Sequence, residues 1–392
     1  MSKLSVYFKN CKNKRDNHIW VFTEWFGKRC GDNGTFFANH VVNDYPEIKA
    51  YWICEKTADT SLLDSKIIVL EKDSQDAEDI LKKAAVAVFI QGIEEFTSEG
   101  FNYCGNALKV NLWHGVMWKK LGFDMPGESS FLKKTKARIK NGFNRHYLFE
   151  TPSDLYADVF QRAFLIKPNE LVKAGQPRNS IFFDENMIKD ARVKISEQLA
   201  NLSGLEINDE TKIITYMPTF RDGVEDAFDF TDYSESEALN EYLKQNNVVL
   251  IQKAHFVRSE GGKESKSFSN MITNNNLIAQ LLLASTDLLI TDYSSCFFDY
   301  LLLDRPIIHF MYDYEFYKEK NRGIYYEYQD VICGDAVFKE EDVLECIREN
   351  LQNPEKESDL RRKRKELYQK YESADSCRII AQEVFKRIGV KN

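Results

Sequence analysis

The sequence predicts an α/β protein with two doubly wound domains, each built on a parallel β-sheet that carries helices on both faces. Short apolar runs, rich in β-branched and aromatic residues, alternate with helix-like stretches. This alternation occurs in two successive series. The chain has 392 residues, enough for two to three domains at about 150 residues per domain.

The first series predicts six strands in the N-terminal part of the chain. Continuous apolar runs spaced for an intervening helix are typical of buried parallel strands in βαβ units. The six runs are Ile19 to Phe22, Tyr51 to Cys54, Ile67 to Leu70, Val86 to Ile90, Val110 to Trp113 and Tyr147 to Phe149.

The second series predicts four more strands, with helical segments such as Asn276 to Ser285 between them. The four runs are Ile213 to Tyr216, Val248 to Gln252, Leu288 to Thr291 and Ile307 to Phe310. We expect two Rossmann-like domains, 1–172 and 173–370, that face a central cleft.

The last fifty residues, from about Glu340, are charged and helical in period, with a basic run from Arg361 to Lys365. A solvated C-terminal helix is the simpler interpretation. In the alternative, a final helix at 371–392 packs back on the first domain.

Composition excludes several classes of protein. The net charge of −8 gives no overall attraction to nucleic acid, so no nucleic-acid partner is expected. No apolar run approaches the roughly 20 residues that span a bilayer, and the N-terminus lacks the apolar core of a secretory signal. We therefore expect a cytoplasmic protein.

Several nucleotide-binding signatures are missing. The chain has no GxGxxG after the first strand, no GxxxxGK[ST] and no Asp-x-Asp. These absences disfavour dinucleotide oxidoreductases, P-loop NTPases and sugar transferases that hold a diphosphate through a cation. We expect no cofactor and no protein-held metal, although a magnesium ion held by substrate phosphates would leave little trace in the sequence.

The segment Leu288 to Tyr300 predicts a phosphate site. An apolar strand ends, Asp292 begins a polar turn, and Ser294 and Ser295 precede an aromatic-rich helix. A helix N-terminus offers unpaired N–H groups and a partial positive charge, to which serine hydroxyls add donors. The alternative is a plain N-cap.

His114 is a candidate general base. It follows a predicted strand directly, and Gly115 lets the chain turn sharply. The carboxyl ends of strands are where α/β folds place catalytic groups, and imidazole titrates near neutral pH. A lone histidine is more often structural, and this alternative stays open.

Basic and hydroxyl side chains also follow the carboxyl ends of two further predicted strands. One carries Lys253, His255 and Arg258, and the other carries Thr219 and Arg221. Taken alone, each set is also explained as ordinary charged and polar side chains on the protein surface. A cleft between two doubly wound domains would gather them with His114.

Residues 118–146 predict a membrane-facing segment. Residues 119–146 contain eight basic and two acidic residues, with apolar side chains interleaved. Such a segment can lie on an anionic membrane surface or guide an anionic acceptor, and a solvated basic helix is the alternative. The candidate side chains are Lys119, Lys133, Lys134, Lys136 and Arg138.

Taken together, the motifs resemble the CDP-glycerol glycerophosphotransferase family, which includes teichoic acid primases and polymerases and related capsule polymerases. The resemblance covers roughly residues 19 to 340, and the motifs are strong in this order and spacing. The matching segments are FGKRCGDN (26–33), WHG with KKLG (113–122), PTFRD (218–222), KxH (253–255), TDYSSxxFDY (291–300), RP (305–306) and YDxxxYxxxxRGxYY (312–326).

The resemblance implies a GT-B type architecture and transfer of an alditol phosphate, glycerol phosphate or ribitol phosphate, from a CDP-alditol. The acceptor would be a hydroxyl of a lipid-linked saccharide or alditol phosphate at the inner membrane face, and CMP would be released. It also implies that domain 1–172 binds the acceptor and domain 173–370 the donor.

Carried over by position, His114 matches the general base and His255 the second essential histidine, near the diphosphate. Arg221, Ser294 and Ser295 match phosphate-holding positions, and Asp299 fits a structural role. Thr219, Lys253 and Asp292 complete the expected donor site.

The chain departs from the family in one motif. Val116 and Met117 follow WHG where the family usually has Thr-Pro, so the acceptor loop can differ in shape. Because the first strand begins near residue 19, we also expect no separate targeting domain. The alternatives are a GT-B glycosyltransferase that uses a nucleotide-sugar and a non-enzymatic scaffold.

Overall fold

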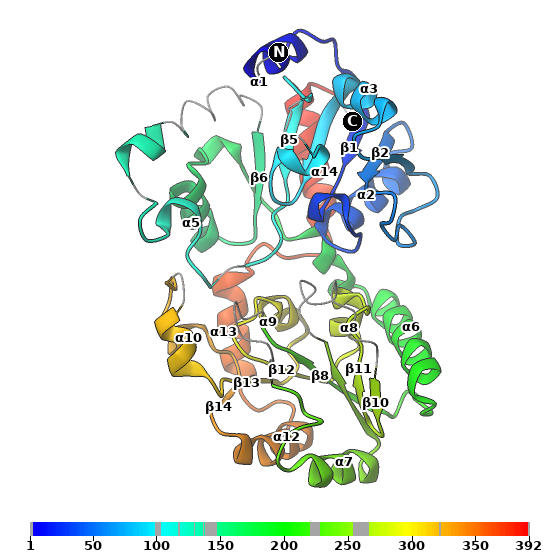
Figure 1. The fold of residues 1–392 in the computed structure, drawn as a ribbon, viewed down its shortest axis with the longest axis vertical. Coiled ribbons are helices and arrows are strands. Elements are labelled where there is room, and N and C mark those ends of the chain that lie inside the picture. The colour runs from blue at the N-terminus through cyan, green and yellow to red at the C-terminus, as the bar shows by residue number, and fades with distance from the viewer. Residues whose placement is uncertain are drawn as a thin grey trace. The chain divides into compact units, whose positions relative to one another are not determined.

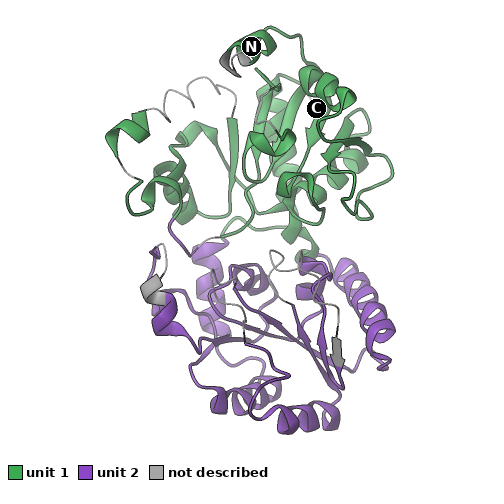
Figure 2. Cartoon of the chain, in the orientation of Figure 1, with its two compact units in different colours: residues 1–116, 121–183, 370–392 green, residues 117–120, 184–369 purple. Residues whose placement is uncertain are grey.

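The computed structural model describes residues 3–98, 103–116, 118–128, 130–135, 137, 147–219, 228–253, 266–320 and 323–390. The chain forms two compact units, which Figure 2 colours separately. Unit 1 comprises Met1–Val116, Leu121–Phe183 and Lys370–Asn392, and unit 2 comprises Met117–Lys120 and Asp184–Gln369.

Unit 1 is built on a sheet of seven parallel strands in the order β3-β2-β1-β4-β5-β6-β7. Figure 1 labels β1, β2, β5 and β6 of this sheet. The order reverses beside β1, as in other doubly wound sheets. The strands are β1 Asp16–Phe22, β2 Lys49–Cys54, β3 Ile68–Glu71, β4 Ala84–Phe89, β5 Leu108–Asn111, β6 Tyr147–Thr151 and β7 Leu171–Lys173.

Helices cover both faces of this sheet. The N-termini of α2, α3 and α5 are capped by Asp32, Ser74 and Ser153, whose side chains accept backbone N–H bonds. The helices are α1 Lys3–Asn10, α2 Asn33–Asp44, α3 Gln75–Lys83, α5 Asp154–Phe164 and α14 Ser376–Ile388. The 3₁₀ turns are η1 Trp25–Gly27, η2 Ile93–Phe96, η3 Gly122–Asp124, η4 Pro168–Glu170 and η5 Pro177–Phe183.

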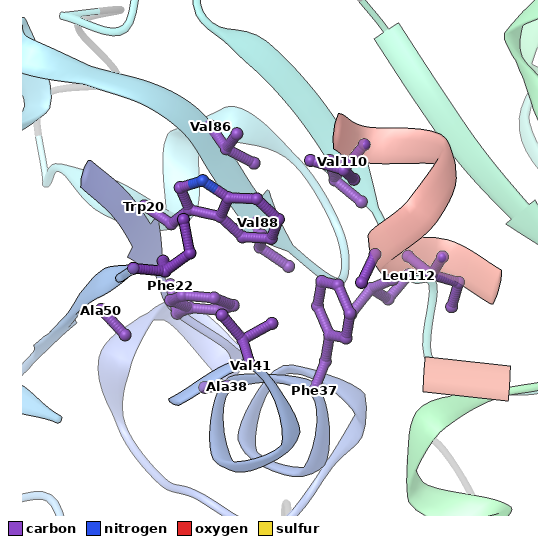
Figure 3. Packing of buried hydrophobic residues seen from close by; sticks show 14 of the residues in the cluster. Trp20, Phe22, Phe37, Ala38, Val41, Ala50, Val86, Val88, Val110 and Leu112 are labelled. Carbon is purple, nitrogen blue, oxygen red and sulfur yellow. The ribbon is translucent and has the colours of Figure 1, made fainter. Parts of the chain in front are cut away.

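The main core of unit 1 lies between the sheet, α2 and α14. Phe37 and Val41 on α2 reach the buried face of β1, where Trp20 and Phe22 lie (Figure 3). From α14, Phe385 packs on Trp20 with ring centroids 5.2 Å apart. Each such side chain contributes about 1.5–3 kcal/mol on burial, so the C-terminal helix is an integral part of unit 1.

Unit 2 shares with unit 1 the order of six parallel strands without repeating the residues, and it adds one antiparallel strand, β10, at the edge of the sheet. Its sheet has the order β10-β11-β9-β8-β12-β13-β14, and all pairs are parallel except β10 with β11. The strands are β8 Lys212–Met217, β9 Val248–Gln252, β10 Lys266–Phe268, β11 Met271–Thr273, β12 Leu288–Thr291, β13 Ile307–Phe310 and β14 Asp335–Val337.

Helices also cover both faces of the second sheet. Apolar residues of α7 and α12 pack on one face, and those of α6 and α8 on the other. The helices are α6 Glu185–Ser203, α7 Ser236–Gln245, α8 Ala279–Ser285, α9 Cys296–Tyr300, α10 Tyr314–Lys320, α11 Tyr328–Val331, α12 Val343–Gln352 and α13 Ser358–Tyr368; the 3₁₀ turns are η7 Leu301–Leu303 and η8 Glu340–Asp342.

The expected fold class, α/β with two doubly wound sheets, is confirmed, and each of the ten expected strands has a counterpart. Four strands of only three residues (β7, β10, β11 and β14) carried too little pattern to be expected. Unit 1 continues to Phe183, beyond the boundary at 172/173 that the sequence predicted. The reason is that β7 pairs with β6 and η5 packs on α2, both in unit 1. The cleft between the sheets stays a prediction.

The solvated interpretation of the C-terminal residues is wrong at Arg361. Its side chain is only 1% exposed and forms an ion pair with Asp304 in unit 2, with Nε and Oδ1 3.0 Å apart. It also donates to the carbonyls of Asp304 and Pro354. A charge run in the sequence does not distinguish such a buried arginine from its exposed neighbours.

Candidate functional site

The carboxyl ends of β1 and β4 form the switch point of the first sheet, where strand order reverses and ligands bind in doubly wound folds. Glu24 leaves β1 at this edge, and Ile90 leaves β4. His114 follows β5 three positions after Asn111, the last strand residue. The structure therefore places the expected base at the edge where the fold favours a site.

A hydrogen bond fixes which imidazole nitrogen of His114 carries the proton. Nδ1 lies 3.3 Å from the carbonyl oxygen of Ile90. A carbonyl oxygen only accepts, so Nδ1 donates and Nε2 keeps its lone pair. Burial lowers the pKa of His114 below its ordinary value, which favours the neutral ring. This tautomer can accept a proton from an alcohol.

The backbone before His114 adopts a left-handed conformation that a tryptophan rarely takes. Trp113 has φ 50°, and its N–H donates to Oδ1 of Asn111 over 2.8 Å. Nδ2 of Asn33 donates to the carbonyls of Leu112 (3.1 Å) and Trp113 (3.0 Å). Such strain costs about 1–3 kcal/mol and persists only where neighbours enforce it, so these bonds hold the turn.

Arg178 extends this support to the histidine itself. Its Nη1 donates to the carbonyl of His114 over 3.1 Å and to Oδ1 of Asp32 over 2.7 Å. The backbone N–H of Arg178 donates to Oδ1 of Asn33. Three successive carbonyls, those of residues 112 to 114, thus accept bonds from Asn33 and Arg178.

Two buried carboxyl groups complete this network. Burial alone would raise the pKa of Asp32, but the charges of Arg178 and Arg29 outweigh it and hold that pKa low. Burial and the nearby charge of Asp32 raise the pKa of Glu24. Glu24 accepts the N–H groups of Asp32 (2.9 Å) and Thr35 (3.1 Å), and so ties β1 to the start of α2.

In unit 2 the corresponding switch point lies between β8 and β12. Asp292 is fully buried there, and its Oδ1 accepts the N–H groups of Thr219 (2.8 Å) and Tyr293 (2.5 Å). Thr291 Oγ1 donates to the carbonyl of Met217 over 2.7 Å. Asp292 therefore connects the carboxyl ends of β8 and β12 through hydrogen bonds.

The structure brings Thr219, Asp292, Ser294 and Ser295 to this one edge. Both serines are half-buried and directly precede α9. Lys253 follows the neighbouring strand β9, and its Nζ donates to the carbonyl of Asn275 over 2.8 Å. Asp299 is buried and accepts from Gln280, in keeping with the structural role expected for it.

The expected basic segment is divided between the two units. Lys119 belongs to unit 2, where its backbone bridges to Ile324 and its Nζ lies 5.0 Å from the ring centre of Tyr317. Lys133 and Lys134 belong to a helical stretch of unit 1, residues 131–135.

Four expected site residues lie outside the described residues: Arg221, His255, Lys136 and Arg138. Across the described ranges, no group of three or more His, Cys, Asp or Glu side chains is placed to hold a metal ion.

A profile of the CDP-glycerol:poly(glycerophosphate) glycerophosphotransferases matches residues 5–386, almost the whole chain. The chain belongs to this glycerophosphotransferase family. The family indicated by the sequence motifs is therefore confirmed.

Several curated relatives in the glycerophosphotransferase family are similar to this chain. A teichoic acid poly(glycerol phosphate) polymerase of Bacillus spizizenii is 34% identical over 252 residues, 62% of this chain and 61% of the relative. A teichoic acid glycerol-phosphate transferase of Staphylococcus aureus is 27% identical over 292 residues, 71% of each chain. The match spans 61% of the Bacillus spizizenii polymerase and 43% of a teichoic acid poly(glycerol phosphate) polymerase of Bacillus subtilis, so this chain covers only part of these relatives.

Solved structures share the fold. The wall teichoic acid polymerase TagF superposes with a TM-score of 0.80 and 21% identity, covering 99% of this chain and 93% of that one. A UDP-GlcNAc 2-epimerase of Neisseria meningitidis bound to UDP-GlcNAc gives a TM-score of 0.55 at 10% identity, covering 94% and 99%.

The sequence did not assign roles to Glu24, Asp32, Asn33 or Arg178. Asp32 and Asn33 lie within FGKRCGDN, one of the family segments, and Arg178 lies within the stretch that separates the two strand series. One signal in the sequence could have identified them. Polar residues that directly follow a strand or precede a helix near a switch point are candidates for a functional site.

Proposed function

We propose that this member of the glycerophosphotransferase family transfers glycerol phosphate or ribitol phosphate from a CDP-alditol to a hydroxyl of a lipid-linked saccharide or alditol-phosphate acceptor. CMP is released, in the synthesis of a teichoic acid-like or capsular polymer. The observation that carries the proposal is the His114–Ile90 hydrogen bond, because it leaves Nε2 able to accept the proton of an alcohol.

In the proposed step, the acceptor hydroxyl gives its proton to Nε2 of His114. The alcohol oxygen forms a bond to the phosphorus that carries the alditol. The bond from that phosphorus to the oxygen bridging it to CMP breaks, and CMP leaves with the electron pair. Phosphoryl transfer depends mainly on in-line positioning and neutralisation of phosphate charge.

In this proposal unit 2 holds the donor. Arg221 and His255 supply positive charge and hydrogen bonds to the diphosphate, and Ser294 and Ser295 supply hydroxyl donors beside α9. The geometry of Asp292 supports a positioning role for its carboxylate, since its Oδ1 is occupied by backbone N–H groups. Thr219 and Lys253, on adjacent strand ends, complete the donor site.

We also propose that unit 1 contacts the inner face of the membrane through residues 131–134. The side chains of Phe131 and Leu132 are 78% and 73% exposed, next to Lys133 and Lys134. Exposed apolar side chains beside cations suit an anionic lipid surface. Among the described residues, none of the helices is both long and apolar enough to span a bilayer.

The test is nucleotide release by the purified protein. CDP-glycerol and CDP-ribitol are supplied in turn with a detergent-solubilised lipid-linked acceptor, and UDP-sugars serve as alternative donors. We expect CMP from at least one CDP-alditol, and release about 10²-fold slower or more from the folded His114→Ala variant. Release of UDP in place of CMP would instead establish a glycosyltransferase. Release of neither nucleotide would contradict both activities.

A further inference from the structure

A cavity of about 290 Å³ in unit 1 lies beside His114 and has no role in the mechanism above. Its floor is one face of strands β4, β5 and β6, where Phe89, Asn111 and Phe149 lie in register. The opposite face of the same strands, with Val88 and Val110, packs into the main core. The cavity is therefore a feature of one sheet face.

The cavity adjoins the proposed base through two chain segments. Trp113 lines the cavity and precedes His114, and the centres of their rings are 4.3 Å apart. Gln91 also lines it and follows Ile90, whose carbonyl accepts the His114 bond. A molecule seated in the cavity would lie next to the residues that aim the imidazole.

Aromatic side chains form much of the wall. Trp113 packs against Phe149 and Phe164 with ring centres 5.8 and 4.8 Å apart, and all three line the cavity with Phe89 and Tyr147. The volume is close to the lower end of ordinary ligand pockets, about 300–1,000 Å³. Flat aromatic faces suit the C–H faces of a sugar ring or a short polyol.

Polar groups among these rings suit hydroxyls. Gln91 and Glu94 add amide and carboxylate groups to the lining, and these pair readily with hydroxyls.

The charges at the cavity disfavour a phosphate group. Glu94 and Glu170 both line it, and a phosphate there would meet two carboxylates. The one lysine of the described lining, Lys109, donates to the carbonyl of Gly105. Burial lowers the pKa of Lys109 to about 8, so that its positive charge is lost more readily as the pH rises than that of an ordinary lysine.

We infer that this cavity binds a neutral polyhydroxyl group, the sugar or alditol of the acceptor that presents its hydroxyl to His114. The inference rests on the proposed function for the identity of the acceptor. The aromatic wall packs on the carbon skeleton, the amide of Gln91 and the carboxylates bond its hydroxyls, and the phosphate of the acceptor stays outside.

The test combines ligand binding with kinetics. The probes are glycerol and methyl β-glucoside, with glycerol 3-phosphate as the charged counterpart, and the reporter is the indole N–H resonance of Trp113, assigned through Trp113→Phe. Ile166→Trp places a larger side chain in the cavity wall. Ile80→Trp on α3 is the matched control, because Ile80 is also half-buried and is not part of this wall.

We expect the neutral probes to shift the Trp113 resonance in the parent chain and in Ile80→Trp, and glycerol 3-phosphate to shift it less. Ile166→Trp should abolish the shift. In turnover, it should raise the acceptor KM about tenfold, the effect of losing about 1.4 kcal/mol of binding free energy, while the donor KM stays unchanged.

Three results would overturn the inference: no shift with any neutral probe, a larger shift with glycerol 3-phosphate, or an unchanged acceptor KM in Ile166→Trp. The binding arm needs no turnover. If no CMP is released but the neutral probes bind in the cavity, the proposed reaction fails and the cavity assignment stands.

Discussion

The two sheets share the order of six parallel strands, yet the carboxyl edges at their switch points are stabilised differently. In unit 1, side chains far apart in sequence hold a strained turn: Asn33 and Arg178 bond the carbonyls of residues 112 to 114. In unit 2, Asp292 bonds N–H groups of its own turn and of the adjacent strand end. In the proposed function, unit 1 fixes the geometry of the base, while unit 2 provides a local framework for donor contacts.

The largest expected effect is the loss of either proposed catalytic histidine. His114→Ala in unit 1 and His255→Ala in unit 2 should each lower CMP release by about 10²-fold or more, the usual contribution of a positioned acid or base. Initial rates with a CDP-alditol and acceptor measure this, and circular dichroism checks folding. A folded His114→Ala variant with a near-normal rate would show that unit 1 does not supply the base.

Arg178→Ala should destabilise unit 1 strongly. The Arg178–Asp32 pair is buried, with 9% of each side chain exposed, and loss of one partner from a buried pair costs about 3–5 kcal/mol. Arg362→Ala in unit 2 is the control, since Arg362 is 63% exposed and surface pairs contribute about 0–1 kcal/mol. Denaturant unfolding measures both, and equal losses would contradict this ranking.

Asn33→Ala should affect both stability and rate. It leaves the carbonyls of Leu112 and Trp113 without their donor, which costs about 1–3 kcal/mol. Because the turn then relaxes, kcat should fall while the donor KM stays near normal. Thr215→Val in unit 2 removes a buried bond to Thr286 and should cost about 0.5–1.5 kcal/mol without a change in kcat. An equal fall of kcat in both variants would show that Asn33 acts through general stability.

The pH dependence of the rate should report on His114. Burial lowers its pKa below 6.5, so the neutral base predominates at pH 7 and above. As the pH falls through this pKa, Nε2 becomes protonated and kcat/KM should fall about tenfold per pH unit. His309→Asn in unit 2 should leave this acid limb in place, because burial of His309 lowers its pKa to about 4 and its Nε2 already accepts from Cys333. A midpoint above pH 7 would count against His114 as the base.

The smallest expected effect per residue concerns the surface of unit 1. Reversing the charge of Lys133, Lys134 and Lys136 to Glu should weaken binding to anionic vesicles by roughly 1 kcal/mol per lysine. Lys189→Glu with Lys194→Glu, on the exposed side of α6 in unit 2, is the control. Vesicle sedimentation measures binding. Unchanged binding of the triple variant would favour the solvated-helix interpretation of this segment.

Local sequence patterns predicted the ten longer strands and the position of His114 after a strand. Continuous apolar runs such as Val86 to Ile90 are visible in a single segment, because they reflect burial of one element. The three-residue strands β7 and β14 lack such a signal, since their position depends on pairing with β6 and β13. Their pairing was therefore accessible only from the folded chain.

The sequence by itself determined the fold class, the family and which motifs stand at strand ends. Only the tertiary structure decided how those motifs are supported. Asp32 and Arg178 are 146 positions apart, the left-handed turn at Trp113 depends on Asn33, and the cavity needs three adjacent strands. Periodicity is a property of neighbouring residues, whereas charge pairing, strain and cavities arise when distant segments pack together.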